Sequence, residues 1–160
     1  MESTAPLVSV IMPAYNHARY IRQTVASIMA QTYPHIEFLV IDDGSSDNTL
    51  EELKRLKSSC EKRFVRSIIQ TQPNSGTCLT LNKLLDMARG EYIYSLGSDD
   101  LLKPQAIAVL LDFLHTHREY VMAVGDNEII DSDFRRIGWD AQRRGVPLEQ
   151  ATYKTLAAFT

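Results

Sequence analysis

The sequence predicts an α/β fold in which a mostly parallel, twisted sheet has helices on both faces. Short β-branched apolar runs alternate, four times in succession, with segments whose apolar residues recur at helical spacing. Successive strand–helix units of this kind join parallel strands through right-handed crossovers. A length of 160 residues is ordinary for one domain with its own core, so a single domain is expected over residues 1–160.

The first two units occupy the N-terminal third of the chain. Leu7–Met12 is an apolar run, and Pro13 is expected to end the strand because proline has no N–H for a sheet ladder. The helix that follows has an apolar face made of Ile21, Val25, Ile28 and Met29. Residues 36–41 form the second predicted strand. Ser46 or Asp47 is then the expected N-cap of a helix with Leu50, Leu53 and Leu56 on one side.

The next two units follow the same pattern. Residues 64–70 predict a strand that is less buried than the others, because it contains Arg66 and Ser67. The helix after it has an apolar face made of Cys78, Leu81, Leu84, Leu85 and Ala88. Gly90 is its expected C-cap, and residues 92–96 form the fourth strand. Pro104 suits the first turn of a helix whose core face is Ile107, Leu110, Leu111 and Leu114.

The rest of the chain is less regular. A fifth strand is expected within residues 120–130. Asp131-Ser132-Asp133 then turns the chain into a short segment over 134–137. Residues 148–159 are predicted to form a helix.

Composition excludes several classes of function. A net charge of −3 argues against binding nucleic acid through bulk positive charge. The two cysteines lack the spacing of a metal or redox motif, which favours a reducing compartment. The N-terminal residues do not resemble a signal peptide, and no apolar run approaches the ~18 residues of a membrane span. A soluble, cytoplasmic protein is expected.

Two acidic pairs are the most informative feature. Asp42-Asp43 follows the second predicted strand, and Asp99-Asp100 follows the fourth. Ligands of open α/β sheets bind beyond the carboxyl ends of the strands. Carboxylates there suit Mg²⁺ or Mn²⁺, or the hydroxyls and ring N–H of a nucleoside. Taken singly, each pair is also explained as a solvated turn or a helix cap.

Two smaller motifs lie at the same predicted edge. Tyr15 follows the first strand, where it either stacks on a base or is an ordinary turn residue. Asn74-Ser75-Gly76 precedes a helix, so its N–H groups either meet a phosphate or simply begin the helix. The glycine-rich fingerprints of dinucleotide-binding folds and of P-loops are both absent from the sequence.

In this order and spacing, the motifs resemble the family 2 glycosyltransferases, which are inverting enzymes of the GT-A fold. The resemblance covers roughly residues 6–130. The segments that carry it are Val8–Asn16, Ser27–Tyr33, Ile41–Asp47, Asn74-Ser75-Gly76 with Asn82, Ala88–Ile93 and Ser98-Asp99-Asp100.

The resemblance implies a site and a set of partners. The implied nucleoside pocket is Pro13, Ala14, Tyr15, Asp42 and Asp43. The donor is also implied to lie near Asn74, Gly76, Asn82, Ser98 and Asp99, with Mg²⁺ or Mn²⁺ held by Asp99 and Asp100. The implied partners are a nucleoside diphosphate sugar and a glycan or lipid-linked acceptor, at the cytoplasmic side of the membrane with peripheral contact. Residues 6–130 would be the nucleotide-sugar-binding core and 131–160 the start of the acceptor side.

Two departures from the family pattern matter. Many members carry Asp at the position of Gly97, so this chain keeps only the later two carboxylates of that motif. The family's general base lies on an acceptor-side segment expected to begin near Thr160. Asp126 and Glu128 read as solvated loop carboxylates, so no base is assigned. A binding fragment that holds the nucleotide sugar without transferring it is the alternative function.

Overall fold

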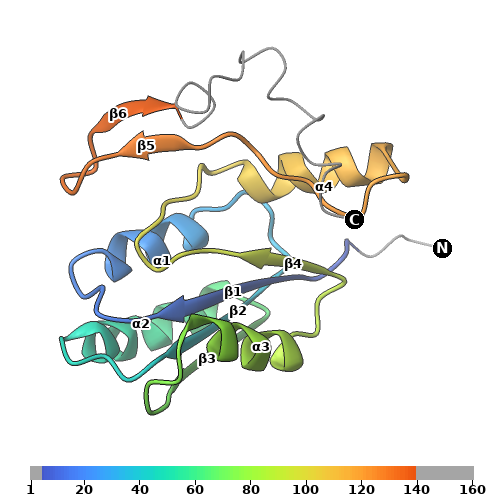
Figure 1. Cartoon of the computed structure of the whole chain (residues 1–160). Coiled ribbons are helices and arrows are strands. Elements are labelled where there is room, and N and C mark those ends of the chain that lie inside the picture. The colour runs from blue at the N-terminus through green and yellow to red at the C-terminus, as the bar shows by residue number, and fades with distance from the viewer. Residues whose placement is uncertain (1–4, 140–160) are drawn as a thin grey trace. The chain divides into compact units, whose positions relative to one another are not determined.

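The structure is a computed structural model that describes residues 5–139, and it divides into two compact units, Met1–Ile107 and Ala108–Thr160 (Figure 1). The first unit contains four strands and three helices. These are β1 (Val8–Ala14), α1 (Ile21–Met29), β2 (Ile36–Asp42), α2 (Thr49–Arg63), β3 (Arg66–Thr71), α3 (Thr77–Met87) and β4 (Tyr92–Ser95). The helix α4 (Ala106–Thr116) begins at the end of this unit.

The four strands form one parallel sheet in the order β3-β2-β1-β4, which confirms the predicted topology. The chain builds outward from β1 through β2 to β3 and then returns to place β4 on the other side of β1. The strand order therefore reverses next to β1, and sheets of this type bind ligands at such a switch point, beyond the carboxyl ends of the strands.

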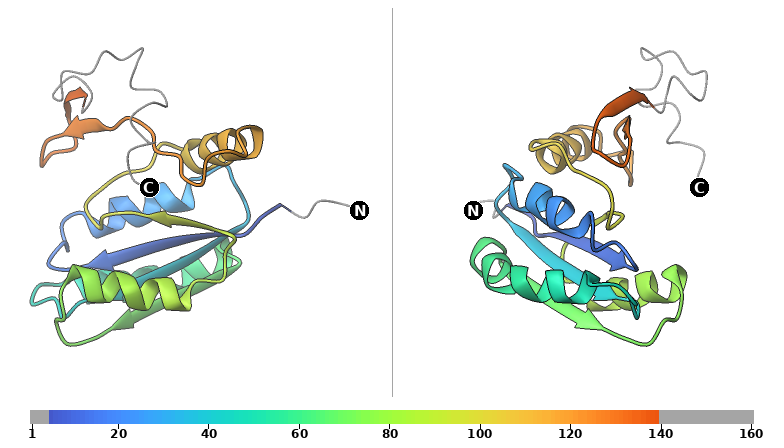
Figure 2. Two further views of the ribbon diagram at one scale, coloured as in Figure 1. Left: turned by 45° about the vertical axis from the view of Figure 1, so that its right-hand side comes forward. Right: turned by 90° about the vertical axis from the view of Figure 1, so that its left-hand side faces the viewer.

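Helices cover both faces of the sheet, as the sequence predicts. Helices α1 and α2 contact each other on one face, while α3 packs on β1 and β2 from the opposite face (Figure 2). Right-handed crossovers require this change of face when the direction of winding reverses. On the α3 side, the core is a cluster of Ile11, Leu39, Ile41 and Leu84. Strand β2 is buried along its whole length, whereas β3 is only half-buried at best, as expected from its polar residues.

The prediction that Pro13 ends the first strand is wrong, because β1 continues to Ala14 and Pro13 pairs with Ile41. The hydrogen-bond directions explain why the sheet tolerates this proline. Ile11 accepts from the Leu96 N–H on the β4 side, and Pro13 faces the same side two residues later. The last β1–β4 pair is Ile11 with Ser95, so β4 has already ended and no ladder bond is lost at Pro13.

Two predicted helix caps also differ from the structure. Asn48, not Ser46 or Asp47, occupies the N-cap position of α2, although Asp47 Oδ1 still accepts from the Thr49 N–H at 2.9 Å. Helix α3 ends at Met87, so Gly90 is not its C-cap. Gly90 instead lies against β1, where a Cβ would be 2.5 Å from Ser9 Oγ. Close approach of two backbones, rather than helix termination, therefore requires this glycine.

In the second unit, β5 (Glu128–Ile130) pairs with β6 (Arg136–Trp139) as an antiparallel hairpin with a register irregularity. The expected fifth strand is thus much shorter than the interval 120–130. The helix expected over 148–159 lies outside the described residues. None of the helices in residues 5–139 has the length and apolar character needed to cross a membrane.

Candidate functional site at the carboxyl edge of the sheet

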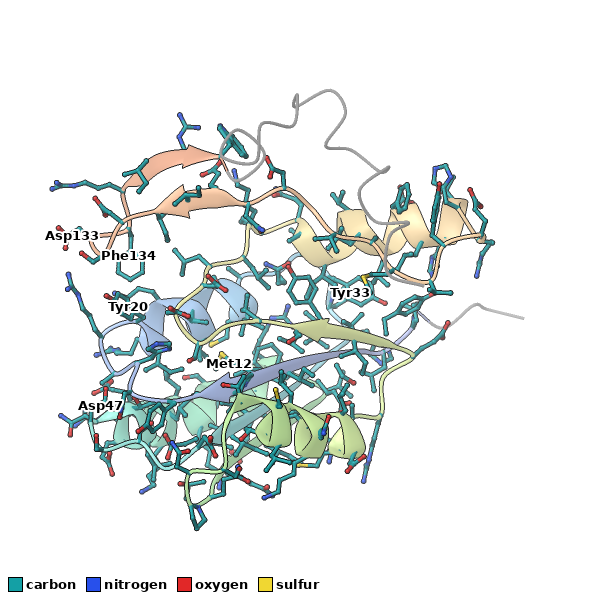
Figure 3. The ribbon with its side chains drawn as sticks, viewed as in Figure 1. Met12, Tyr20, Tyr33, Asp47, Asp133 and Phe134 are labelled. Atoms are coloured by element: carbon teal, nitrogen blue, oxygen red, sulfur yellow. The ribbon has the colours of Figure 1, made fainter. Side chains whose placement is uncertain are left out.

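The first unit gathers most of the predicted site residues at the carboxyl ends of its strands. Figure 3 labels Asp47 at this edge and Tyr33 near the opposite one, with Met12 in the buried sheet between them. Asp42 ends β2, and Ser98 follows β4. The loop after β1 contacts both neighbouring loops, since Asn16 bonds to Ser45 and His17 to Ser98. Three strand ends are therefore joined at one edge.

Asp43 is held as a buried carboxylate by the loop that follows β3. Its Oδ1 accepts from Gln72 Nε2 at 2.7 Å and from the Ser75 N–H at 2.9 Å, and its Oδ2 accepts from the Gly76 N–H at 2.8 Å. Burial on its own raises the pKa of a carboxyl, but the hydrogen bonds from Gln72 and this loop lower the pKa of Asp43 from 3.8 to about 2. Asp43 is therefore negatively charged at neutral pH.

Gly44 lets the same loop come close to β2. Its φ of +71° lies in the left-handed region, and a Cβ there would be 2.7 Å from the Asn74 nitrogen. Any larger residue would push the loop away from Asp43. The glycine in the Asp-Asp-Gly motif thus keeps the N–H donors within reach of the carboxylate.

Asp42 is equally buried but is less well satisfied. Its Oδ2 accepts from Thr71 Oγ1 at 2.9 Å, whereas its Oδ1 is buried and has no hydrogen-bond partner among the described residues. Leaving such an acceptor unpaired costs about 1–3 kcal/mol, and more for a charged group. This unpaired acceptor lies where the sequence predicts nucleoside binding.

The second acidic pair is brought together around Gly97. A Cβ at Gly97 would be 2.7 Å from Asp100 Oδ2 and 3.1 Å from Asp99 Oδ1, so both carboxylates converge on the space that a side chain would fill. Partial burial and the charge of Asp99 raise the pKa of Asp100. Ser98 is buried and lies beside the pair, with its Oγ 2.7 Å from His17 Nδ1.

This pair fits a cation shared with a ligand rather than one enclosed by the protein. Within residues 5–139, no three His, Cys, Asp or Glu side chains are grouped so that they hold a metal ion alone. Asp99 and Asp100 would supply two carboxylates. Mg²⁺ is usually held by one or two carboxylates together with water and substrate phosphates. The residues present therefore suit a metal–diphosphate unit.

The remaining predicted residues differ in how closely they join the site. Tyr15 is 47% exposed at the end of β1, so its ring is accessible for stacking. The N–H groups of Ser75 and Gly76 donate to Asp43 and are not free for a phosphate. Asn74 is exposed at the start of this loop. Asn82 lies further along α3 at an exposed position, and among the described residues no hydrogen bond links it to the others.

Sequence reasoning missed three residues, two at the carboxyl edge of the sheet and one near the start of β2. Gln72 lies just beyond β3, and the parallel register places it next to Asp43, a signal that strand pairing alone could have supplied. His17 has no sequence signal beyond its place after β1. Glu37 could have been noticed, because a charged residue inside an otherwise apolar strand requires a specific set of partners.

Known proteins share both the sequence pattern and the architecture. A sequence model of Glycosyl transferase family 2 matches residues 9–158. The putative teichuronic acid biosynthesis glycosyltransferase TuaG of Bacillus subtilis (strain 168) is 38% identical over 114 residues, which are 71% of this chain and 44% of TuaG. TarS of S. aureus has a TM-score of 0.62 at 25% identity, over 78% of this chain and 21% of TarS.

A second solved structure is the mannosyltransferase PcManGT from Pyrobaculum calidifontis in complex with GDP-Man and Mn²⁺. It has a TM-score of 0.56 at 28% identity, over 62% of this chain and 29% of PcManGT. The chain thus spans less than half the length of each of these relatives. The shared architecture confirms the expected GT-A fold, and the match over nearly the whole chain shows that it belongs to glycosyl transferase family 2.

Proposed function

We propose that this chain is the donor-binding part of an inverting glycosyltransferase that moves a sugar from a nucleoside diphosphate sugar to a glycan or lipid-linked acceptor. The observation that carries the proposal is the gathering of two carboxylate pairs at one sheet edge. One pair is exposed and converges beside Gly97, and the other retains an unpaired oxygen among the described residues. Family membership and the complex of PcManGT with GDP-Man and Mn²⁺ support it.

The nucleoside is assigned to the end of β1 and β2. Tyr15 would stack on the base, and Pro13 and Ala14 would line the pocket at the end of β1. Asp42 and Asp43 would accept hydrogen bonds from the base N–H. A charged acceptor makes such a bond roughly twice as strong as a neutral one. Because hydrogen bonds lower the pKa of Asp43, the pair has a fixed acceptor over the whole physiological range.

The diphosphate and sugar are assigned to the edge next to β4. Asp99 and Asp100 would hold Mg²⁺ or Mn²⁺ on the diphosphate, with Ser98 beside them and Asn74, Gly76 and Asn82 near the donor. The cation would neutralise charge on the leaving nucleoside diphosphate. An acceptor hydroxyl would attack the anomeric carbon as the bond to the diphosphate breaks, and a base outside the assigned residues would take its proton.

The acceptor side is proposed to begin in residues 131–160. The setting we propose is surface polysaccharide assembly at the cytoplasmic side of the membrane. The name of the B. subtilis relative, which refers to teichuronic acid biosynthesis, supports this setting.

Calorimetric titration of the 160-residue chain with UDP and GDP, with and without Mn²⁺, tests the proposal. At least one of the two should bind, and more tightly with Mn²⁺. Asp99→Asn and Asp100→Asn should each remove most of the Mn²⁺-dependent gain, a loss of about 10-fold or more. Asp112→Asn, an exposed carboxylate on α4, is the matched control and should behave as wild type. Absence of binding by both nucleotides would contradict the proposal.

A second candidate function is a module that binds the donor without transferring the sugar. All of the assigned donor residues lie in the unit Met1–Ile107, and no base is assigned among the described residues. Transfer assays with radiolabelled nucleotide sugars separate the two functions. Transfer by the 160-residue chain would exclude the binding module, and tight binding without transfer or donor hydrolysis would favour it.

A further inference from the structure

The loop after β1 is fastened to the loop after β2 by backbone and side-chain hydrogen bonds. The Asn16 N–H donates to Ser45 Oγ at 2.9 Å, and Asn16 Oδ1 accepts from the Ser46 N–H at 2.8 Å. The Ala18 N–H donates to Asp47 Oδ2 at 3.0 Å. Asn16 has a φ of +54°, a conformation that asparagine adopts more readily than most residues. The serine-rich stretch after Asp43 therefore serves to fix this loop.

His17 extends from the fastened loop to the second acidic pair. Its N–H donates to Thr49 Oγ1 at 2.8 Å, which fixes its backbone at the start of α2. Its ring Nδ1 is hydrogen-bonded to Ser98 Oγ at 2.7 Å and lies 3.7 Å from Asp99 Oδ1. The backbone of His17 and its ring Nδ1 are thus each held by a hydrogen bond, and the same ring nitrogen faces the Asp99 carboxylate. The ring therefore lies against two of the assigned residues, because it is hydrogen-bonded to Ser98 and faces the Asp99 carboxylate.

The backbone of the acidic loop is held separately, by α1 and by a residue just after its C-cap. The bonds run from Thr24 Oγ1 to Ser98 O (3.0 Å), from the Leu102 N–H to Ser27 Oγ (3.0 Å) and from Gln31 Nε2 to Lys103 O (2.8 Å). Thr24 and Ser27 lie one turn apart on α1 and Gln31 lies two residues beyond its end, so α1 and its C-terminal end fix the loop's path. Loss of the His17 ring should therefore leave the loop backbone in place and affect only the side chains.

We propose that His17 is a positioning residue for the acidic pair. It sets the direction of the Asp99 carboxylate so that it converges with Asp100 in the space beside Gly97. The inference rests on the proposed function, in which this pair holds the divalent cation on the diphosphate. Asp99 is half-exposed, with 50% of its side chain accessible, so without the ring the carboxylate is free to adopt other rotamers. The conformational entropy that is lost when cation binding orders the carboxylate again then weakens that binding.

The nucleoside side of the site should not respond to the same change. Asp43 is fixed by Gln72, Ser75 and Gly76, none of which contacts His17. A role in positioning the acidic pair therefore predicts that loss of the ring separates nucleotide affinity without metal from the gain in affinity that the metal gives. Binding without metal stays as in wild type, and the metal-dependent gain falls. A general structural role predicts instead that both decrease together and that thermal stability falls.

Calorimetric titration of the full chain with UDP and GDP, in EDTA and in Mn²⁺, measures this split for His17→Ala and His17→Asn. His17→Ala should keep the affinity in EDTA and lose about 10-fold of the affinity in Mn²⁺, the usual size of an outer-shell effect. His17→Asn, whose amide can still bond to Ser98, should restore most of the loss. His35→Ala, whose ring bonds to Ala5 O near the start of β2, is the matched control and should match wild type.

Two results would overturn the inference while leaving the proposed function intact. One is an unchanged gain from Mn²⁺ in His17→Ala. The other is a parallel loss in EDTA and Mn²⁺ accompanied by a lower melting temperature. A wild-type chain that binds nucleotide with no gain from Mn²⁺ would overturn the metal assignment itself, and this inference with it.

Discussion

Strand β2 carries a buried carboxylate near each end, and the two differ in how completely their oxygens are hydrogen-bonded. Glu37 lies near its start and Asp42 at its end, with exposures of 0% and 1%. Both carboxylate oxygens of Glu37 have hydrogen-bond donors, while Oδ1 of Asp42 has none among the described residues. The carboxylate at the start of the strand thus stabilises the fold. The carboxyl end keeps an unmet acceptor, which is the pattern expected where a ligand binds.

The network around Glu37 joins three strands and the connection between α3 and β4. Its Oε1 accepts from Ser9 Oγ and from the Arg89 N–H, each at 2.5 Å, and its Oε2 accepts from Arg66 Nη1 at 2.7 Å. Burial alone would raise the pKa of Glu37, but the hydrogen bonds from Ser9, Arg89 and Arg66 lower it below its usual value. Glu37 is therefore a buried anion that ties the sheet together away from the site.

Removing Glu37 should give the largest loss of stability. In Glu37→Ala the Arg66 guanidinium and several buried donors lose their acceptor, and breaking a buried charge pair from one side costs about 3–5 kcal/mol. Urea unfolding followed by circular dichroism measures this. Glu61→Ala, an exposed glutamate on α2, is the control and should change the free energy of unfolding by less than about 0.5 kcal/mol. A loss below about 1 kcal/mol for Glu37→Ala would refute the contrast between the two ends.

A smaller loss is expected from Gly90→Ala. The added Cβ would be 2.5 Å from Ser9 Oγ and 2.6 Å from the Ser9 nitrogen, so β1 or the α3–β4 connection must move. Overpacking of this kind costs about 1–3 kcal/mol. Gly125→Ala is the matched control, because a Cβ there meets nothing within 4 Å. Equal unfolding midpoints for the two variants would show that the packing at Gly90 is looser than described.

The smallest expected effect is a pH dependence of stability that arises from Asp43, just after the carboxyl end of β2. Because the pKa of Asp43 falls from 3.8 to about 2 on folding, its contribution to stability is complete above pH 3.8 and is lost as the pH drops towards 2. Asp43→Asn should therefore be less stable than wild type at pH 7, and the difference should shrink between pH 4 and 2. Urea unfolding at several pH values in this range checks it. A difference that stays constant with pH would argue against the lowered pKa.

The order of strands and helices was predictable because it depends on local periodicity. Alternation of apolar runs with helical spacing fixes the element types, and crossover handedness then fixes the faces. The location of the acidic pairs followed from the same reasoning, since parallel strands end at one edge. The roles of Pro13 and Gly90 were not predictable from local rules. They depend on where β4 stops and on how closely two backbones approach, which are tertiary facts.

The partners that satisfy each carboxylate were also beyond local sequence reasoning. Gln72 is 29 residues from Asp43, and the Gly90 N–H that bonds to Glu37 is 53 residues away. Nothing in the residues near either carboxylate specifies which distant donor will reach it. The register of the sheet places Gln72 beside Asp43, and the packing of the α3–β4 connection against β1 places Gly90 beside Glu37.

The same distances have a consequence for the lifetime of the protein. Because Asp43 is held by partners from a segment 29 to 33 residues further along the chain, the site exists only when the sheet is assembled. A ligand that binds the native state alone, at 100 times its Kd, adds about 2.7 kcal/mol to the free energy of unfolding. On the proposed function, a bound nucleotide sugar would therefore slow proteolysis that proceeds through the unfolded chain.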